Sequence, residues 1–258
     1  MSVLRPLSAL SAEEREWIGG FLGHDGVLPL YFETAIEDLA RGIDNRLVLI
    51  GRERRGLVLG IVFAGLEAFT ILGSLDDAEL RATYTRLMPG ELHVTAELAA
   101  YLRPQLGTRL VAELAMRTET CAIGQRTSDP SCVQMTDADR EKLTAFYNTH
   151  NPRHVFSPWM LEHPFFAVVE QGEILAAAGV LALSRRLGWA LIGNFLTRPD
   201  RRGRGLARRV GNTLLAALGR NGIGHAALVT TDDNVAARSV YRDLGFVLAE
   251  AGIELDLK

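Results

Sequence analysis

The sequence predicts an α/β chain with two domains, each built on a central, mostly antiparallel mixed sheet flanked by helices. Three observations lead to this prediction. The chain has 258 residues, of which 48% are hydrophobic and 23% are charged, as expected for one or two globular domains. Both halves open with a capped amphipathic helix. Strands come first in each half and then alternate with helices, which is typical of a mixed sheet with helices on its faces.

A short polar segment rich in turn-forming residues divides the chain. Residues 124–130 (Gly-Gln-Arg-Thr-Ser-Asp-Pro) indicate a linker or a crossing segment. We therefore expect one domain over residues 1–127 and another over residues 128–258. The helix starts at Ser11–Glu14 and Thr136–Asp139 each place a hydroxyl three residues before an acid, which is a capping pattern. The repeated opening suggests a duplicated architecture.

The elements of the first half follow from period and turn residues. Trp17, Ile18, Phe21 and Leu22 give the first helix its apolar face. After it, alternating and apolar runs bounded by turn residues predict strands, and the runs with helical spacing predict helices. The expected strands cover 46–51, 56–64, 67–72, 92–95 and 110–116, with a turn at 52–55 and helices at 76–87 and 96–102.

The second half repeats this style with stronger signals. Leu143, Phe146 and Tyr147 have the spacing of a helix face. An apolar residue at every fourth position from Leu206 to Leu218 predicts a buried helix stripe. The remaining segments predict an antiparallel meander at 165–170, 174–183 and 189–197, a strand at 225–231, a helix at 234–243, and a closing hairpin of 246–249 with 253–257.

Composition excludes several classes of protein. The 28 Lys and Arg residues against 31 Asp and Glu residues give a net charge of −3, which argues against a general nucleic-acid binder. No apolar stretch reaches the ~18–20 residues needed to span a bilayer, and the N-terminus lacks the pattern of a signal peptide. Cys121 and Cys132 lack metal-site spacing and are expected to be reduced packing residues. We expect a cytoplasmic protein without a metal site or a membrane partner.

The sharpest local signal is the segment Thr197–Ala207, in which a strand ends and a glycine-containing loop opens directly into a helix. Free backbone N–H groups at a helix N-terminus can bind a phosphate or pyrophosphate, and Gly203 and Gly205 allow close approach. Six arginines lie between residues 198 and 209. The Gly-Lys-Ser/Thr ending of a Walker loop is missing, and Arg208 stands where a dinucleotide fingerprint needs its third glycine or alanine. An ordinary strand-to-helix turn with a solvated basic face is the alternative.

Two motifs resemble one known family. Arg202-x-x-Gly205-x-Ala207 matches the first signature of the GNAT superfamily of acyl-CoA N-acyltransferases. Its second signature, Asn-x-x-Ala-x-x-x-Tyr-x-x-x-Gly-Phe, is matched from Asn234 to Phe246. The resemblance covers the second half, so the first half is expected to be a degenerate copy in a tandem two-domain form.

The resemblance implies a coenzyme site and an activity. Asn234 would hydrogen-bond the pantetheine arm of acetyl-CoA, and the Tyr241 hydroxyl would protonate the departing thiolate. The activity would be the transfer of the acetyl group to a primary amine by direct attack in a ternary complex. The residues implied to bind the coenzyme, through main-chain groups before the loop and N–H groups within it, are Phe195, Leu196, Thr197, Arg202, Gly203, Arg204, Gly205, Leu206, Ala207, Asn234, Ala237 and Tyr241.

The acceptor and the general base stay open. The acceptor is a small-molecule or peptide amine, which includes amino acids, protein N-termini, lysines and antibiotic amines; the acidic first half slightly favours a cationic amine. Many relatives place a glutamate on the strand before the loop, whereas this chain has Gly193 and Asn194. His154, Glu162 and His163 precede the meander and are candidates, although a solvated or locally bonded polar residue is the favoured interpretation of each.

Two other functions compete with catalysis. A coenzyme A-binding sensor or scaffold without turnover would explain why no base is evident, although it has no need of a proton donor at Tyr241. A nucleotide- or RNA-binding module that uses the arginines is disfavoured, because no aromatic stacking platform lies beside them in the sequence.

Overall fold

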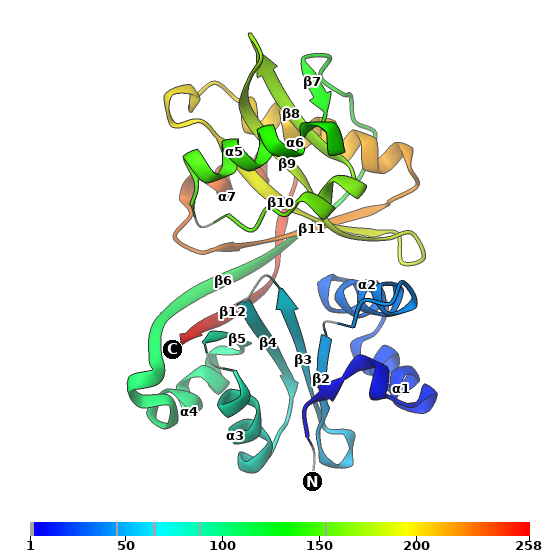
Figure 1. Ribbon diagram of the computed structural model, residues 1–258, viewed down its shortest axis with the longest axis vertical. Coiled ribbons are helices and arrows are strands. Elements are labelled where there is room, and N and C mark those ends of the chain that lie inside the picture. The colour runs from blue at the N-terminus through cyan, green and yellow to red at the C-terminus, as the bar shows by residue number, and fades with distance from the viewer. Residues whose placement is uncertain (1–2, 45, 64–65, 88, 153) are drawn as a thin grey trace.

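The computed structural model describes all residues except 1–2, 45, 64–65, 88 and 153. Across the described residues, strands from both halves of the sequence join in a 12-stranded mixed sheet of order β1-β2-β3-β4-β5-β12-β6-β11-β10-β9-β8-β7. Figure 1 shows an N-terminal lobe below and a C-terminal lobe above. We define the N-terminal lobe as β1–β5 with α1–α4, and the C-terminal lobe as β7–β11 with α5–α7. The remaining strands, β6 and β12, run through both.

Among the described residues, the elements predicted for the first half are present, and β1 (Arg5–Pro6) is a two-residue strand that was not predicted. A helix, α2 (Val27–Ala40), was not predicted either. Its apolar residues surround it, so it lacks the one-sided pattern by which helices are recognised. The other elements are α1 (Ala12–Leu22), β2 (Arg46–Ile50), β3 (Gly56–Phe63), β4 (Leu66–Gly73), α3 (Asp77–Arg86), β5 (Gly90–Val94), α4 (Ala96–Leu106) and β6 (Leu110–Ala122).

The predicted meander and both helices of the motif region are confirmed in the second half. The elements are β7 (Cys132–Gln134), α5 (Arg140–His150), a 3-10 helix at Pro158–Glu162, β8 (Phe165–Glu170), β9 (Glu173–Ser184), β10 (Trp189–Thr197), α6 (Leu206–Arg220), β11 (His225–Thr231), α7 (Val235–Asp243) and β12 (Val247–Leu257).

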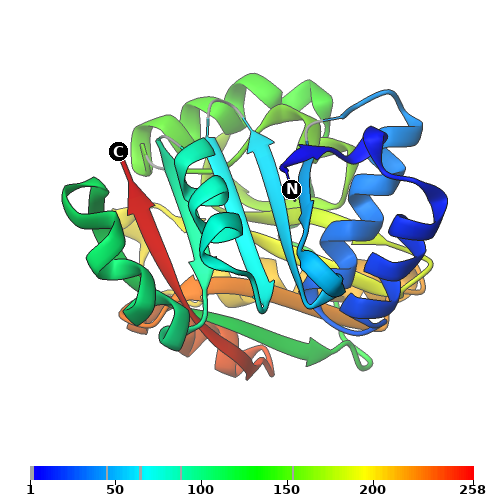
Figure 2. The ribbon, with the colours of Figure 1, turned by 90° about the horizontal axis from the view of Figure 1, so that it is seen from below.

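Helices cover both faces of the N-terminal lobe, as Figure 2 shows from below. On one face, Ile18 of α1 and Phe32 of α2 pack against Leu57 of β3. On the other face, helices α3 and α4 pack against the alternate residues of the strands, including Phe69. Successive side chains of a strand point to opposite faces, so the sheet has one hydrophobic core on each side.

The C-terminal lobe is layered in the same way, with one addition from the first half. Helices α6 and α7 cover one face and α5 covers the other. On the α5 face, Leu30 of α2 packs against Trp189 and Leu191 at the start of β10. An ion pair of 3.1 Å joins Arg41, just after α2, to Glu162. Helix α2 therefore bridges the two lobes.

The predicted C-terminal hairpin is wrong. Residues 247–257 form one continuous strand, β12, which pairs antiparallel with β6 and passes straight through Gly252. Its last residues, Ile253–Leu257, also pair with β5, so the end of the chain completes the sheet of the N-terminal lobe. Strand β6 likewise extends past the predicted 110–116 and pairs with β11 through residues 116–122. A division at residues 127 and 128 stays a prediction, and two strands exchange across it.

The segment between the halves is anchored rather than free. Arg126 donates to the carbonyl of Leu244 at 2.7 Å and to Asn212 Oδ1 at 3.1 Å. Asp129 forms a 2.8 Å ion pair with Arg209 of α6. The crossing segment therefore holds α6 and the end of α7 in place.

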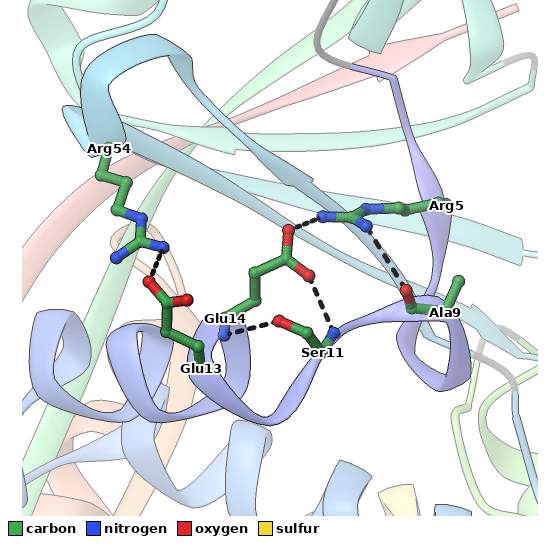
Figure 3. Close-up of polar contacts among 6 residues, drawn as sticks. All are labelled: Arg5, Ala9, Ser11, Glu13, Glu14 and Arg54. Atoms are coloured by element: carbon green, nitrogen blue, oxygen red, sulfur yellow. Dashed lines mark hydrogen bonds and ion pairs between the residues drawn. The ribbon is translucent and has the colours of Figure 1, made fainter.

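The predicted helix caps are confirmed, and Figure 3 shows the first of them. Ser11 Oγ accepts from the Glu14 amide at 3.2 Å, and the Glu14 carboxylate accepts from the Ser11 amide at 2.8 Å. Arg5 pairs with Glu14, and Arg54 of the β2–β3 turn reaches Glu13 at 2.7 Å. Thr136 and Asp139 form the corresponding capping box before α5.

The structure bears on the cysteines and on the question of a membrane-spanning helix. Cys121 is buried, Cys132 is partly buried, and both are free thiols. Of the helices in the part of the chain that the structure describes, none has the length and apolar character to cross a membrane.

Candidate active site

The site is built where two neighbouring parallel strands stop pairing. The ladder between β10 and β11 joins Trp189–Leu191 to His225–Ala227 and ends there, while β10 continues to Thr197 and β11 to Thr231. On its other edge β10 still pairs with β9 through Leu196 and Thr197. Ligands of open α/β sheets bind beyond the carboxyl ends of the strands, so the unpaired inner edges mark this position.

A β-bulge lies on β10 where the ladder has ended. Gly193 pairs with Gly179 and Leu196 pairs with Ala177, so Asn194 and Phe195 together stand opposite one residue of β9. Asn194 has φ +54°, in the left-handed region that non-glycine residues seldom adopt. Such strain costs about 1–3 kcal/mol and persists where the surroundings hold it.

Tyr147 of α5 holds the bulge. Its hydroxyl donates to the Asn194 carbonyl at 2.5 Å, and Asn194 Nδ2 contacts Met160 Sδ at 3.2 Å. Burial raises the pKa of Tyr147 well above its ordinary value, which keeps the hydroxyl protonated and able to donate. The sequence assigned Tyr147 only to a helix face, because nothing local relates it to a residue 47 positions later.

The loop after β10 presents an open helix N-terminus. Gly203 and Gly205 have φ +75° and +71°, and no heavy atom outside the adjoining residues lies within 4 Å of the position that a Cβ would take at either. Gly205 is the N-cap of α6, no side chain caps the helix, and its first turn carries no acidic residue. The N–H groups and the positive end of the helix dipole are therefore available to an anion.

Only half of the arginines near the loop are free. Arg198 and Arg201 pair with Asp200, and Arg209 pairs with Asp129. The other three, Arg202, Arg204 and Arg208, are exposed and form no ion pair with any described residue. Leu206 is buried and Ala207 is partly buried, so these two residues offer the site their backbone alone.

Asn234 begins α7 and uses its amide on both sides. Its Oδ1 accepts from the Ala237 amide at 3.3 Å, and its Nδ2 donates to Thr230 Oγ1 at 3.3 Å. Asn234 is therefore an N-cap, as expected, and it is solvent-exposed at the end of β11. Gly245, with φ +88°, terminates the helix.

Tyr241 connects α7 to the bulge. Its ring packs edge-to-face on Phe195 with 5.3 Å between centroids. Burial, and to a smaller extent the Glu119 carboxylate, raise the pKa of Tyr241, so the hydroxyl stays protonated at neutral pH. Gly211 of α6 permits this packing, because a Cβ there would lie 2.5 Å from Leu244 and 3.1 Å from Phe195.

The three candidate bases lie on the α5 side, where the ring of His154 packs against that of Tyr147 with 5.4 Å between centroids. Glu162 is paired with Arg41, and His154 Nε2 lies 2.8 Å from Asn148 Oδ1. Burial lowers the pKa of His163, which leaves its imidazole neutral at pH 7. Within the described residues, no hydrogen bond or ion pair links any of the three to the predicted coenzyme residues.

Two charged clusters had no signal in the sequence. Arg117 and Glu119 of β6 form a 3.0 Å ion pair beside α7. In the N-terminal lobe, His93 Nε2 lies 3.2 Å from Glu254 and 3.6 Å from Glu91. Although burial opposes it, hydrogen bonding to these two carboxylates raises the pKa of His93 to about 9. The three groups lie close enough to ligate a cation, and the protonated imidazole already pairs with both carboxylates.

Comparison with known proteins finds a family match in the second half of the chain. Residues 132–246 match the model of the acetyltransferase (GNAT) family. No curated protein matches the sequence. Among solved structures, a Drosophila protein is 11% identical over 100% of this chain and 99% of its own, with a TM-score of 0.74.

Two further solved structures resemble the whole chain. A GCN5-related N-acetyltransferase from Sphaerobacter thermophilus is 12% identical over 98% of this chain and 94% of its own, with a TM-score of 0.66. A tandem GNAT protein from the clavulanic acid biosynthesis pathway is 12% identical over 99% and 98%, with a TM-score of 0.58. At these identities the likeness shows a shared fold. Residues 132–246 therefore match the acetyltransferase (GNAT) family, and the chain as a whole shares the fold of solved GNAT structures, a tandem GNAT protein among them.

Proposed function

We propose that the protein is an N-acetyltransferase that moves the acetyl group of acetyl-CoA to a primary amine by direct attack within a ternary complex. The observation that carries the proposal is the open N-terminus of α6. The loop of residues 198–205 joins it to the bulged end of β10, whose edge toward β11 is unpaired. The family match at residues 132–246 supports the same chemistry.

The coenzyme would lie along the unpaired strand ends. Backbone N–H groups from Arg202 to Ala207 would bind the pyrophosphate, with the free charges of Arg202, Arg204 and Arg208 beside it. Main-chain groups of Phe195–Thr197 would pair with the pantetheine arm as a strand edge pairs with a peptide. Asn234 would hydrogen-bond the same arm from α7, where Ala237 lies on the neighbouring turn.

The reaction would form a C–N bond and break the C–S bond of the thioester. A neutral amine attacks the carbonyl carbon, and the Tyr241 hydroxyl donates to the departing sulfur. The amine loses one proton and the sulfur gains one, so the reaction balances. Burial raises the pKa of Tyr241 further above that of a thiol, which is about 8.5, so proton transfer from the tyrosine to the thiolate alone is unfavourable. The proton lost by the amine restores the Tyr241 hydroxyl and completes the transfer.

The first half would support this site without carrying one of its own. We propose that residues 1–127 form a degenerate domain that covers or braces the acceptor side. Helix α2, which packs against β10, is the element through which it does so. The acceptor class stays a small-molecule or peptide amine; the cytoplasmic location and the lack of a nucleic-acid partner stay expectations from the sequence.

Binding and turnover test the proposal separately. Calorimetric titration should show one acetyl-CoA per chain, and thiol release should rise with one or more members of an amine panel. Tyr241→Phe should lower thiol release at least tenfold while acetyl-CoA binding survives. Tyr101→Phe is the matched control, because it removes a hydroxyl that donates to Asp77 on the N-terminal lobe. A wild-type chain that does not bind acetyl-CoA would overturn the assignment.

The coenzyme A-binding sensor is the second candidate. It is favoured by one observation, namely that within the described chain none of the three candidate bases forms a hydrogen bond or an ion pair with the predicted coenzyme residues. Acetyl-CoA binding without thiol release toward any amine, in both the wild type and Tyr241→Phe, would support the sensor instead.

A further inference from the structure

A chain of opposite charges joins β6 to the start of α7. Arg117 places Nε 3.0 Å from Glu119 and Nη1 2.9 Å from Asp232. Asp232 in turn lies 3.3 Å from Arg238, which also donates to its backbone carbonyl at 2.6 Å. The network therefore alternates in sign from a strand of the first half of the sequence to a helix of the second half.

The network fixes the loop that carries Asn234. The Asp232 amide donates to the Ala115 carbonyl of β6 at 2.7 Å, so the loop is fastened to β6 through backbone and side chain together. Arg117 is also the register partner of Thr230, whose hydroxyl accepts from Asn234. Arg117 is thus linked to Asn234 in two ways, through its ion pair with Asp232 and through its register partner Thr230.

The inner end of the network is buried. Glu119 is 5% exposed and lies between Leu228 of β11 and Leu248 of β12. A carboxylate taken out of water is costly unless it is paired, and an apolar residue at this position would often be no less stable. Glu119 therefore fixes the guanidinium of Arg117 in one orientation, with its second nitrogen directed at Asp232.

We propose that Arg117 is a positioning residue for acetyl-CoA, which it serves by holding the Asp232–Asn234 loop, and that Glu119 orients it. The inference rests on the proposed function. Both residues precede residue 132, where the family match begins, so the acetyltransferase domain depends on a strand outside it. The ligand affected is the pantetheine part of the coenzyme, which Asn234 would bind, and not the phosphate part at α6.

The test compares two ligands on the full chain. Arg117→Met and Asp232→Asn should each raise the Kd for acetyl-CoA about tenfold, and the double variant should be no weaker than the single ones. Adenosine 3′,5′-bisphosphate, which lacks the pantetheine arm, should bind both variants as it binds the wild type in competition titrations. Arg117→Lys, which keeps the charge but cannot bridge both carboxylates, should fall between wild type and Arg117→Met.

Two outcomes would overturn the inference. Unchanged acetyl-CoA affinity in both single variants would show that the network does not position the loop, and equal weakening toward both ligands would show a general structural defect. Asp232 is 52% exposed at its side chain, so Asp232→Asn remains informative if Arg117→Met does not fold. Arg103→Met, which breaks the exposed pair with Glu113 on the same strand, is the control. A wild type that does not bind acetyl-CoA would instead defeat the proposed function.

Discussion

The two lobes share a strand-loop-helix-strand arrangement, but the N-terminus of the helix is capped by side chains in one lobe and uncapped in the other. In the N-terminal lobe, β4 leads through a loop into α3, and the next strand, β5, pairs parallel with β4. In the C-terminal lobe, β10 leads in the same way into α6, and β11 pairs parallel with β10. In the C-terminal lobe the helix starts at Gly205 without a side-chain cap. In the N-terminal lobe, Asp76 Oδ1 accepts from the Glu79 amide at 2.9 Å, and the Glu79 carboxylate accepts from the Asp76 amide at 3.0 Å.

The difference is the reason why we propose an anion site in the C-terminal lobe and not in the N-terminal lobe. Glu79 is 4% exposed and also accepts from the Arg52 amide at 2.9 Å, so two carboxylates fill the place that a pyrophosphate would take. These charges satisfy the helix dipole and repel a phosphate. A shared fold therefore need not carry a shared site, because a few side chains at one helix terminus can decide whether an anion is bound there.

The largest expected effect is on the open terminus. Gly205→Glu adds a negative charge and a Cβ at φ +71°, and it should lower acetyl-CoA affinity at least a thousandfold, about 4 kcal/mol, as measured by calorimetry. Gly222→Glu is the matched control, since Gly222 is an exposed glycine with φ +80° at the other end of α6. Comparable losses in both variants would contradict a phosphate site at Gly205.

Shortening one buried side chain of β12 tests how far the two lobes unfold independently. Leu255 lies near the C-terminus but is fully buried in the core of the N-terminal lobe. Leu255→Ala should cost about 3 kcal/mol of unfolding free energy in urea, through the cavity that it leaves. Because β12 and β6 run through both lobes, circular dichroism and loss of acetyl-CoA binding should report one transition. Two separated transitions would show that the lobes unfold independently, and Val247→Ala at the exposed start of β12 is the control.

Removing the cap of the closed terminus should affect stability alone. Asp76→Ala should destabilise the protein by about 1 kcal/mol in urea unfolding, as other N-cap losses do. Acetyl-CoA affinity and the stoichiometry of one per chain should not change. Thr95→Ala, at the capped start of α4, should give a similar loss. A second bound acetyl-CoA in Asp76→Ala would mean that the cap alone had closed a competent site.

The smallest expected effect is on stability, at the charged side chains between the paired strands β5 and β12. The pKa of His93 is raised to about 9, against an ordinary value of 6.5, so its pairing with Glu254 and Glu91 stabilises the fold fully below pH 6.5 and is lost as the pH rises through 9. His93→Gln should therefore cost about 1 kcal/mol near pH 6, after allowance for solvent screening at a side chain 39% exposed, and little near pH 10. A loss independent of pH would contradict this, and His24→Gln, at an exposed position, is the control.

Prediction succeeded where the signal was local. The capping boxes at Ser11 and Thr136, the helix of residues 206–220 and the turn glycine Gly245 depend on residues a few positions apart. The loop at Gly203 and Gly205 belongs to the same class, because a strand end, a glycine φ and a helix start are all encoded within it.

Prediction failed where the partner was distant in the sequence. The residues from Phe246 onward have the alternation of a strand, but nothing in that alternation says that β5 and β6 receive it. Helix α2 was missed because it is apolar on several sides, and the reason became visible only when both lobes were seen to contact it.

The sequence by itself determined the helices other than α2, the strands of the meander, the glycine loop before α6 and the family motifs, because each is set by backbone preference and short-range hydrogen bonding. Only the tertiary structure decided the exchange of β12, the bulge held by Tyr147 and the pairing of Arg117 with Asp232, 115 positions apart. Such contacts are selected by packing and by the cost of leaving buried polar groups unpaired, and those costs arise only once the sheet has closed.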